Sequence, residues 1–283
     1  MIKTLKNLNE LVLFQHTVFS LPFIFIAMIV GAHGWFGWKL LLLGTFAAIT
    51  ARNFAMAFNR YVDRKFDIMN PRTSSRPSVD GRLSGSMILF FMIANALFFV
   101  ITAFLINDLA FYLSPLFLVI LAFYSYVKRF SYLAHLFLGL ALGLAPIAGA
   151  IAVVGTVPVW SLYLSFGVLF WVAGFDLLYA LQDLDYDKEN GLHSIPAKFG
   201  VENTLLISRA FHIITVFMWA LFVLNAHLGV LAQSGLIVAL LMLVYEHVLV
   251  SRGLENINRA FFTVNGYLGF IFLGFIILDF TWL

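Results

Sequence analysis

The sequence predicts an all-α integral membrane protein, on the evidence of its composition and of the spacing of its apolar runs. Of the 283 residues, 62% are hydrophobic and only 11% are charged, against about 45–50% and about 25% in an average soluble domain. Apolar runs recur from one end of the chain to the other, and the segments between them are short except after the second and sixth runs. Residues 1–283 are therefore expected to form a single polytopic membrane domain.

Nine apolar runs are long enough to cross about 30 Å of hydrocarbon as helices. The predicted spans cover residues 17–33, 39–58, 86–106, 109–127, 132–154, 160–181, 205–225, 228–250 and 261–282. The first run follows Lys3 and Lys6 as a secretory signal would, but eight further spans make it an uncleaved first helix. The chain has no cysteine, which excludes disulfides, thiolate metal sites and thiol nucleophiles.

Charge falls almost entirely on one side of these spans. Every lysine and arginine except Lys39 and Arg52 lies on the face that carries the N-terminus. The distribution of positive charge therefore predicts a cytoplasmic N-terminus. All acidic residues except Asp108 and Asp279 lie on the same face, although topology requires only the positive charges. The excess of both signs on one face indicates a site there.

Two acidic motifs follow the second and the sixth predicted spans. The first is NRYVDRKFD, residues 59–67, and YALQDLDYD, residues 179–187, aligns with it at one fixed offset. The alignment pairs the polar positions Asn59 with Tyr179, Asp63 with Asp183, and Asp67 with Asp187. Each set has i, i+4, i+8 spacing, which on a continuous helix places three side chains on nearly one face. A weak duplication of a four-helix unit is consistent with this match.

The residue types in these motifs suit a metal-bound diphosphate. Carboxylates clustered without paired histidines or cysteines favour a hard cation, and Mg2+ is held by few carboxylates together with substrate phosphates. The nearby arginines and lysines would bind the phosphate oxygens that the metal leaves free. The alternative is that these are ordinary solvated loop charges, as most such runs are. Two runs in register at one membrane face favour a site.

Arg52 lies seven residues before Asn59, two turns deeper on the same predicted helix face. An arginine inside a membrane span costs at least about 2.5 kcal/mol and is a functional hypothesis by default. Its guanidinium would hold the carboxylate of a second, smaller substrate, or pair with a carboxylate such as Asp176 at the equivalent depth of the sixth span. The two roles are compatible.

These motifs resemble those of the UbiA superfamily of intramembrane prenyltransferases. The first motif of that family is N-D-x-x-D-x-x-x-D, and the second is D-x-x-x-D, often preceded by a tyrosine. The segments NPRTSSRP (70–77), YSYVKRFSYL (124–133) and GFDLLYALQD (174–183) also resemble family segments in the expected order. The last is similar to the sixth helix of the 4-hydroxybenzoate polyprenyltransferase branch, and the resemblance covers most of the chain.

The resemblance implies a UbiA-type bundle of nine transmembrane helices around a central cavity that opens to the cytoplasmic face of a bacterial inner membrane. It implies Mg2+-dependent transfer of a polyprenyl group from an allylic polyprenyl diphosphate to the ring of a hydroxylated aromatic acid, in ubiquinone or menaquinone biosynthesis. The expected partners are these two substrates and the lipid bilayer. No nucleic acid and no obligatory protein partner is expected.

The resemblance also assigns roles to residues, position by position. The implied metal ligands and catalytic residues are Asp63, Asp67, Asp183 and Asp187. Contacts to the diphosphate are implied for Asn59, Arg72, Lys128 and Arg129. Contacts to the aromatic acceptor are implied for Arg52 and Tyr179.

Arg60 departs from the family pattern, which has aspartate at that position. The Asn-Arg start, with NPRT and GLHSIPAKFG (191–200) downstream, also resembles relatives of the futalosine route to menaquinone, in which the acceptor is a dihydroxynaphthoate. The acceptor therefore stays open between 4-hydroxybenzoate and a dihydroxynaphthoate, while the second motif argues against haem or chlorophyll prenylation.

A membrane ion or solute transporter is the competing class of function. It would place ionisable residues at mid-membrane in several helices. Here only Arg52, Asp176 and Glu246 lie deeper than the charged face, so the prenyltransferase is favoured.

Overall fold

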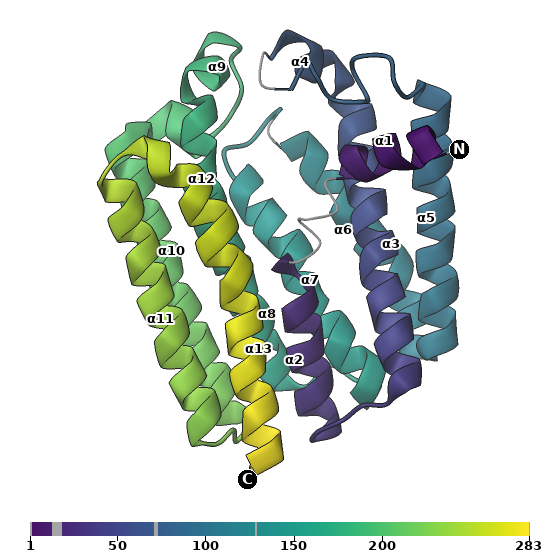
Figure 1. The fold of residues 1–283 in the computed structure, drawn as a ribbon, viewed down its shortest axis with the longest axis vertical. Helices are drawn as coiled ribbons and strands as arrows, with labels where there is room; N and C mark the ends of the chain where they lie inside the picture. The colour runs from purple at the N-terminus through teal and green to yellow at the C-terminus, as the bar shows by residue number, and fades with distance from the viewer. Residues whose placement is uncertain (1, 13–18, 71–72, 128, 283) are drawn as a thin grey trace. The chain divides into compact units, whose positions relative to one another are not determined.

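The fold is helical throughout the part of the chain that the computed structural model describes, residues 2–12, 19–70, 73–127 and 129–282 (Figure 1). This confirms the all-α prediction. Among the described residues, eight helices are long and apolar enough to cross a membrane, as expected of a multi-pass membrane protein. The first predicted span, 17–33, corresponds to the shorter apolar helix α2, Leu21–Ala32, and begins outside the described residues.

The chain divides into two compact units. The first unit draws on residues 1–18 and 39–126, and the second on residues 19–38 and 127–283. The first acidic motif belongs to the first unit and the second acidic motif to the second unit.

The first unit contains two short helices and three long ones. These are α1 (Ile2–Val12), α3 (Trp38–Val62), α4 (Arg64–Met69), α5 (Gly85–Ile106) and α6 (Asp108–Val127). Helix α3 contacts α5 through the side chains of Asn53 and Asn95, whose Nδ2 and Oδ1 atoms are 3.1 Å apart. It contacts α6 through the rings of Phe58 and Tyr126. The Ser84 hydroxyl accepts a hydrogen bond from the amide of Met87 and so begins α5.

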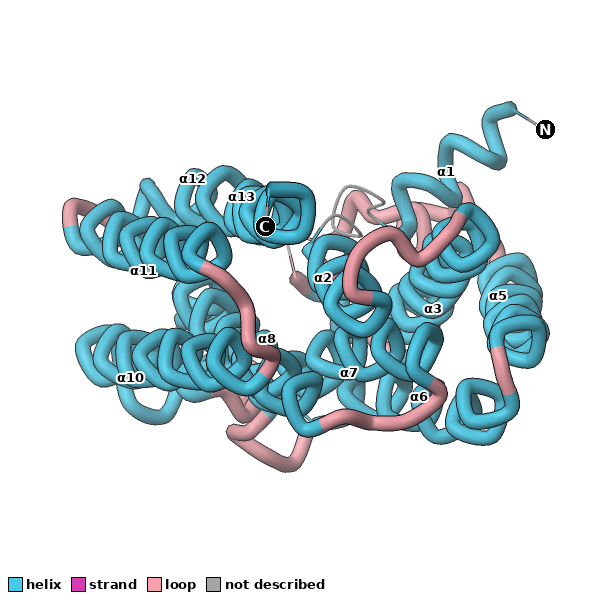
Figure 2. Tube along the Cα trace, turned by 90° about the horizontal axis from the view of Figure 1, so that it is seen from below, coloured by secondary structure: helices cyan, strands magenta, loops and turns pink. Residues whose placement is uncertain are grey.

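The second unit contains six of the long or apolar helices and several short turns. Its elements are α2, α7 (Ala134–Val154), α8 (Val159–Ala180), the 3-10 turn η2 (Leu181–Asp183), α9 (Leu184–Glu189), α10 (Ile195–Asn225), α11 (Val230–Ser251), η3 (Leu254–Asn256), α12 (Ile257–Arg259), the π-helix η4 (Ala260–Val264) and α13 (Asn265–Trp282). Helix α8 packs against both α7 and α10, and α11 packs against α13 (Figure 2). Helix α2 packs on α7 and α13.

Small residues let α7 and α8 approach closely, as the glycine-rich run in α7 suggests. A Cβ atom at Gly143 would lie 2.9 Å from the carbonyl oxygen of Ser165, and one at Gly139 would collide with the backbone of Leu169. Spacing of small residues by four is a common way to pack membrane helices. Behind this contact lies an aromatic core, in which the rings of Phe23 and Trp171 are 5.1 Å apart.

The start of one predicted span, 205–225, needs correction. Helix α10 begins at Ile195, ten residues before the predicted start at residue 205, because Ser194 caps it and Pro196 occupies its first turn. Helix α10 is kinked at Gly200, because the φ of 77° at this residue is outside the helical range. The last span starts with the π-helical turn η4 and continues as α13.

Candidate active site

The first motif lies where α3 ends and α4 begins. Asn59 belongs to the last turn of α3, and Asp63 stands between the two helices with φ −88° and ψ 5°. The prediction of one continuous helix face is therefore wrong in detail. One-turn spacing is nevertheless retained, because the amide of Asp63 donates to the Asn59 carbonyl at 2.8 Å and the amide of Asp67 donates to the Asp63 carbonyl at 2.9 Å.

The second motif has the same local structure in the other unit. Tyr179 belongs to the last turn of α8, and Asp183 ends the turn η2 and precedes α9, with φ −102° and ψ 7°. The short helices α4 and α9 contain six residues each. Neither Asp63 nor Asp183 uses its carboxylate to cap the helix that follows. The sequence alignment of the two motifs is therefore matched by the backbone.

Asn59 is the centre of the polar contacts of the first motif. Its Nδ2 atom donates to Asp63 Oδ2 at 2.7 Å and lies 3.4 Å from Ser125 Oγ on α6. Its Oδ1 atom accepts a hydrogen bond from Arg60 Nη1 at 3.2 Å. Arg60 is only 7% exposed, so the guanidinium that replaces the family's aspartate is part of the site.

Asp67 is held by an arginine that sequence reasoning did not select. Arg76 Nη1 lies 2.6 Å from Asp67 Oδ1, and the Asp67 side chain is 10% exposed. The Thr73 hydroxyl donates to the Asp67 carbonyl at 2.9 Å. The other carboxylate oxygen, Asp67 Oδ2, is buried and has no hydrogen-bond partner in the described chain.

Asp187 occupies the equivalent position of the second motif but has different surroundings. It is only 2% exposed. Its Oδ2 atom is buried without a hydrogen-bond partner, and among the described residues its carboxylate forms no ion pair. Asp183 is also buried.

Arg52 is half-buried on α3, as its span position predicts. Its Nε atom is buried and lacks a hydrogen-bond partner within the described residues. Asp176, the alternative partner considered from the sequence, has His135 beside it in its own unit: His135 Nδ1 and Asp176 Oδ2 are 2.7 Å apart.

Tyr179 packs against the π-helical turn at the start of the last span. Its ring centroid lies 4.3 Å from that of Phe261, which in turn contacts Phe175 on α8 at 5.2 Å. Phe262, the next residue of the turn, meets Tyr179 edge-on at 6.2 Å. The π-helix therefore sets the position of the ring that is expected to face the acceptor. Such turns often occur at functional sites.

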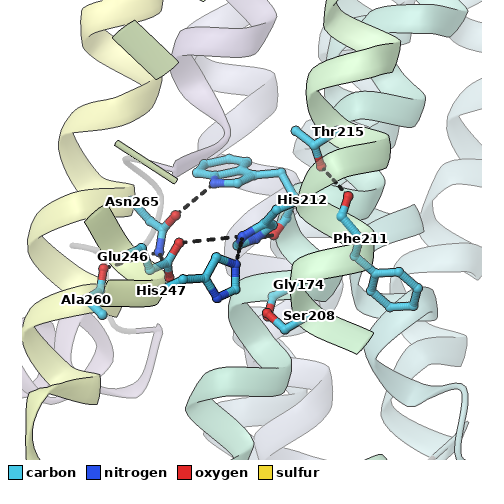
Figure 3. Close-up of polar contacts among 10 residues, drawn as sticks. Gly174, Ser208, Phe211, His212, Thr215, Glu246, His247, Ala260 and Asn265 are labelled. Carbon is cyan, nitrogen blue, oxygen red and sulfur yellow. Dashed lines mark hydrogen bonds and ion pairs between the residues drawn. The ribbon is translucent and has the colours of Figure 1, made fainter. Parts of the chain in front are cut away.

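A buried polar cluster holds this turn in place, and the sequence analysis missed it (Figure 3). Asn265 donates to Glu246 Oε1 at 2.7 Å and to the Ala260 carbonyl at 3.2 Å, and it accepts from Trp171 Nε1 at 2.8 Å. His212 lies beside Glu246, with 3.9 Å between Nδ1 and Oε2. The cluster links α8, α10, α11 and α13. Single polar residues within apolar runs were the only sequence signal for it.

Besides Asn59, three diphosphate contacts were predicted, and only one of these three residues lies in the described part of the chain. Arg129 is exposed in the turn between α6 and α7. Arg72 and Lys128 lie outside the described residues.

The donor set fits a hard divalent cation. Each motif supplies two of the predicted carboxylate ligands, and in each one carboxylate oxygen is buried without a hydrogen-bond partner among the described residues, Asp67 Oδ2 and Asp187 Oδ2. Among the described residues, no three histidine, cysteine, aspartate or glutamate side chains are grouped closely enough to hold a metal. The carboxylate oxygens themselves suit Mg2+, which retains water and substrate phosphate oxygens among its ligands.

Comparisons with known proteins identify the family to which the chain is similar. A family model described as the UbiA prenyltransferase family matches residues 20–275. A 4-hydroxybenzoate octaprenyltransferase from Polynucleobacter necessarius subsp. necessarius (strain STIR1) is 32% identical, over 84% of this chain and 83% of that protein.

Two solved structures share the fold. A UbiA homolog from Aeropyrum pernix K1 matches with a TM-score of 0.85 and 31% identity, over 93% of this chain and 98% of that chain. A UbiA homolog from Archaeoglobus fulgidus, bound to DMAPP and Mg2+, matches with a TM-score of 0.79 and 22% identity, over 98% of this chain and 100% of that chain.

Proposed function

This chain belongs to the UbiA prenyltransferase family, and on that basis we propose that it transfers a polyprenyl group from an allylic polyprenyl diphosphate to the ring of a hydroxylated aromatic acid. The reaction would use Mg2+ and serve respiratory quinone biosynthesis. The chain would act as one polytopic domain in a bacterial cytoplasmic membrane, with its site on the cytoplasmic face, where its arginines and lysines gather. A transporter is not favoured, because the family membership is that of an enzyme.

The observation that carries this proposal is the match between the two motif ends. Both have an aspartate between a long helix and a six-residue helix, and one turn later both have a buried carboxylate oxygen with no hydrogen-bond partner among the described residues. We assign metal binding to the motif carboxylates Asp63, Asp67, Asp183 and Asp187. We assign diphosphate binding to Asn59, Arg72, Lys128 and Arg129. The Archaeoglobus fulgidus homolog, which is bound to DMAPP and Mg2+, supports by analogy the use of Mg2+ with a prenyl diphosphate.

The motif residues would act mainly through charge. When bound, Mg2+ would stabilise the negative charge that gathers on the leaving diphosphate. Asn59, Arg72, Lys128 and Arg129 would orient the diphosphate, and the motif carboxylates would fix the position of the metal. Preorganised charge of this kind is usually the largest single contribution to catalysis.

The acceptor would be held by residues deeper in the helices. Arg52, whose Nε has no hydrogen-bond partner among the described residues, would bind the acceptor carboxylate, and Tyr179 would flank the ring. As the allylic C–O bond breaks, its electron pair leaves with the diphosphate, and the ring carbon ortho to the hydroxyl bonds to the allylic carbon. The ring proton then passes to diphosphate or to a motif aspartate, and aromaticity is restored. Aromatic side chains around the site would stabilise the allylic cation.

Two aromatic acids remain candidates for the acceptor. The relatives named 4-hydroxybenzoate octaprenyltransferase favour 4-hydroxybenzoate. Arg60 favours a dihydroxynaphthoate of the futalosine route, because this buried guanidinium stands where the 4-hydroxybenzoate branch has aspartate.

The test is an assay in purified membranes with Mg2+, a long polyprenyl diphosphate, and either 4-hydroxybenzoate or a dihydroxynaphthoate, read by mass spectrometry. We expect one prenylated product, absent in Asp63→Ala and Asp183→Ala variants. No product with either acid would contradict the proposal. Arg52→Ala should raise the KM for the aromatic acid more than that for the diphosphate, and the reverse would refute the carboxylate role of Arg52.

A further inference from the structure

We propose that Arg76 is an internal counter-cation, which holds Asp67 in the metal-free protein and moves to the diphosphate when substrate binds. The consequence is an order of binding: the first motif binds a divalent cation tightly only together with diphosphate. This inference rests on the proposed function, since it concerns the same metal and the same diphosphate.

The contact between Arg76 and Asp67 is short and largely buried. Arg76 Nη1 and Asp67 Oδ1 are 2.6 Å apart, with side-chain exposures of 23% and 10%. A charge-assisted hydrogen bond at this distance is strong. It occupies Oδ1, while Oδ2 remains buried without a partner in the described chain. A metal binding through both oxygens of Asp67 would have to displace the guanidinium from one of them.

The backbone places Arg76 at this position. The Thr73 amide donates to the Asn70 carbonyl at 3.0 Å, and the Arg76 amide donates to the Thr73 carbonyl at 3.1 Å. The Thr73 hydroxyl ties this turn to the Asp67 carbonyl, and Thr73 is 2% exposed. Residues 73–76 therefore fold back on the motif and place the Arg76 guanidinium beside Asp67.

A second guanidinium favours the release of Arg76. Arg60 is buried and is within electrostatic range of both Asp67 and Arg76. Asp67 is therefore in contact with one cation, Arg76, and within electrostatic range of a second, Arg60, which repels Arg76. A diphosphate brings more negative charge than one carboxylate, and its oxygens match the two-pronged geometry of arginine. Arg76 would gain more by contacting the diphosphate than by staying on Asp67, and Asp67 would then be free for the metal.

The experiment compares two arginines of the same loop. Arg76→Gln removes the proposed counter-cation. Arg82→Gln removes the same charge from an exposed arginine that pairs with Glu10 and Asp80 instead. The full-length proteins, purified in detergent, are titrated with Mn2+ and free Mn2+ is read by electron paramagnetic resonance, without and with inorganic diphosphate.

In the wild type, diphosphate should tighten Mn2+ binding at least about tenfold, a coupling of about 1.4 kcal/mol. Arg76→Gln should bind Mn2+ about three- to tenfold more tightly than the wild type when diphosphate is absent, and its coupling should shrink. Arg82→Gln should follow the wild type. Arg76→Lys keeps the positive charge but lacks the two-pronged guanidinium. Its Mn2+ affinity should therefore lie between those of the wild type and Arg76→Gln.

Equal Mn2+ affinities of wild type and Arg76→Gln without diphosphate would overturn this inference and leave the proposed function standing. Equal increases of Mn2+ affinity in Arg76→Gln and Arg82→Gln would also overturn this inference, because they would show a general effect of removing a positive charge. If the wild type binds no Mn2+ even with diphosphate, the proposed function itself is wrong.

Discussion

The two acidic motifs share a backbone but differ in what balances their charge. In the first unit, the Asp67 carboxylate is 2.6 Å from the Arg76 guanidinium, with Arg60 buried nearby. In the second unit, Asp187 is 2% exposed and has no ion pair among the described residues. The shared motif backbone thus determines the position of each carboxylate. The loop that follows the first motif adds a cation, Arg76, that contacts Asp67 before substrate binds.

This difference separates two ways of preparing a metal ligand. A carboxylate with its own arginine is stable without metal but must exchange partners to bind it. A buried carboxylate without a counter-charge is costly in the metal-free protein and gains directly when a cation binds. The following predictions test or refine this contrast.

The largest effects are expected on catalysis. Asp67→Asn and Asp187→Asn should each lower kcat by about 100- to 1000-fold, since each removes a preorganised charge from the site. Asp185→Asn is the matched control, because Asp185 lies in the second motif but is exposed, and its kcat should stay within about twofold of wild type. Product formation in purified membranes measures all three, and a loss in Asp185→Asn equal to that in Asp187→Asn would remove the distinction between buried and exposed motif aspartates.

Asp67→Asn and Asp187→Asn should change the stability of the metal-free protein in opposite directions. Asp187→Asn removes a buried carboxylate that has no ion pair among the described residues and should raise Tm, whereas Asp67→Asn leaves the Arg76 guanidinium without its partner and should lower it. A change of about 1 kcal/mol either way corresponds to about 2–4 °C. Thermal unfolding in detergent with a chelator present measures both shifts. Shifts of the same sign would contradict the contrast between the motifs.

The second motif also depends on the polar cluster behind it. Asn265→Leu should cost about 1–3 kcal/mol of stability, because Trp171 and the buried Glu246 each lose a hydrogen bond to Asn265. It should also raise the KM for the aromatic acid, since the turn that positions Phe261 against Tyr179 loses its anchor.

Asn95→Leu is the control for that variant, because Asn95 is also buried in a membrane helix and bonds Asn53 of α3. It should cost comparable stability without changing that KM. A KM that rises equally in both variants would show that the cluster has no specific link to the acceptor.

The smallest effect concerns helix α1. The Arg82 hydrogen bonds lower the pKa of the Glu10 carboxyl below its ordinary value of 4.5. A carboxyl whose pKa is lowered on folding stabilises the folded state above its unfolded pKa, and that contribution is lost as pH falls through the folded value. The Glu10–Arg82 ion pair, which holds α1, should therefore weaken only below about pH 4.5. Because the pair is exposed, hydrogen-exchange protection of α1 should change only a few-fold, and Glu10→Gln should abolish that pH dependence.

Much of this architecture could be predicted from the sequence, because hydrophobicity and motif spacing determine it directly. The apolar runs predicted the long helices, and the fixed offset between Asp63 and Asp183 predicted the equivalence that the backbone confirms. The bend at each central aspartate could not be predicted, because i, i+4, i+8 spacing fits a continuous helix equally well.

The contacts made through loops and between distant helices were also beyond the sequence. Arg76 meets Asp67 across a turn that leaves no periodic pattern, and it was one of several basic residues after the motif. Asn265, Glu246 and His212 are isolated polar residues on three different helices, and nothing in the chain indicates that they pair. A pairwise contact of this kind is visible only once the helices are packed.

The central proposal is that both motifs serve one metal-bound diphosphate. The most direct measurement is diphosphate-dependent Mn2+ binding to the wild type, Asp67→Asn and Asp187→Asn, read by electron paramagnetic resonance. We predict that either substitution alone removes the diphosphate-dependent binding, although the two residues belong to different units of the chain. If one variant keeps wild-type binding, or if each keeps an independent share of it, the two motifs do not form a common site and the proposal is wrong.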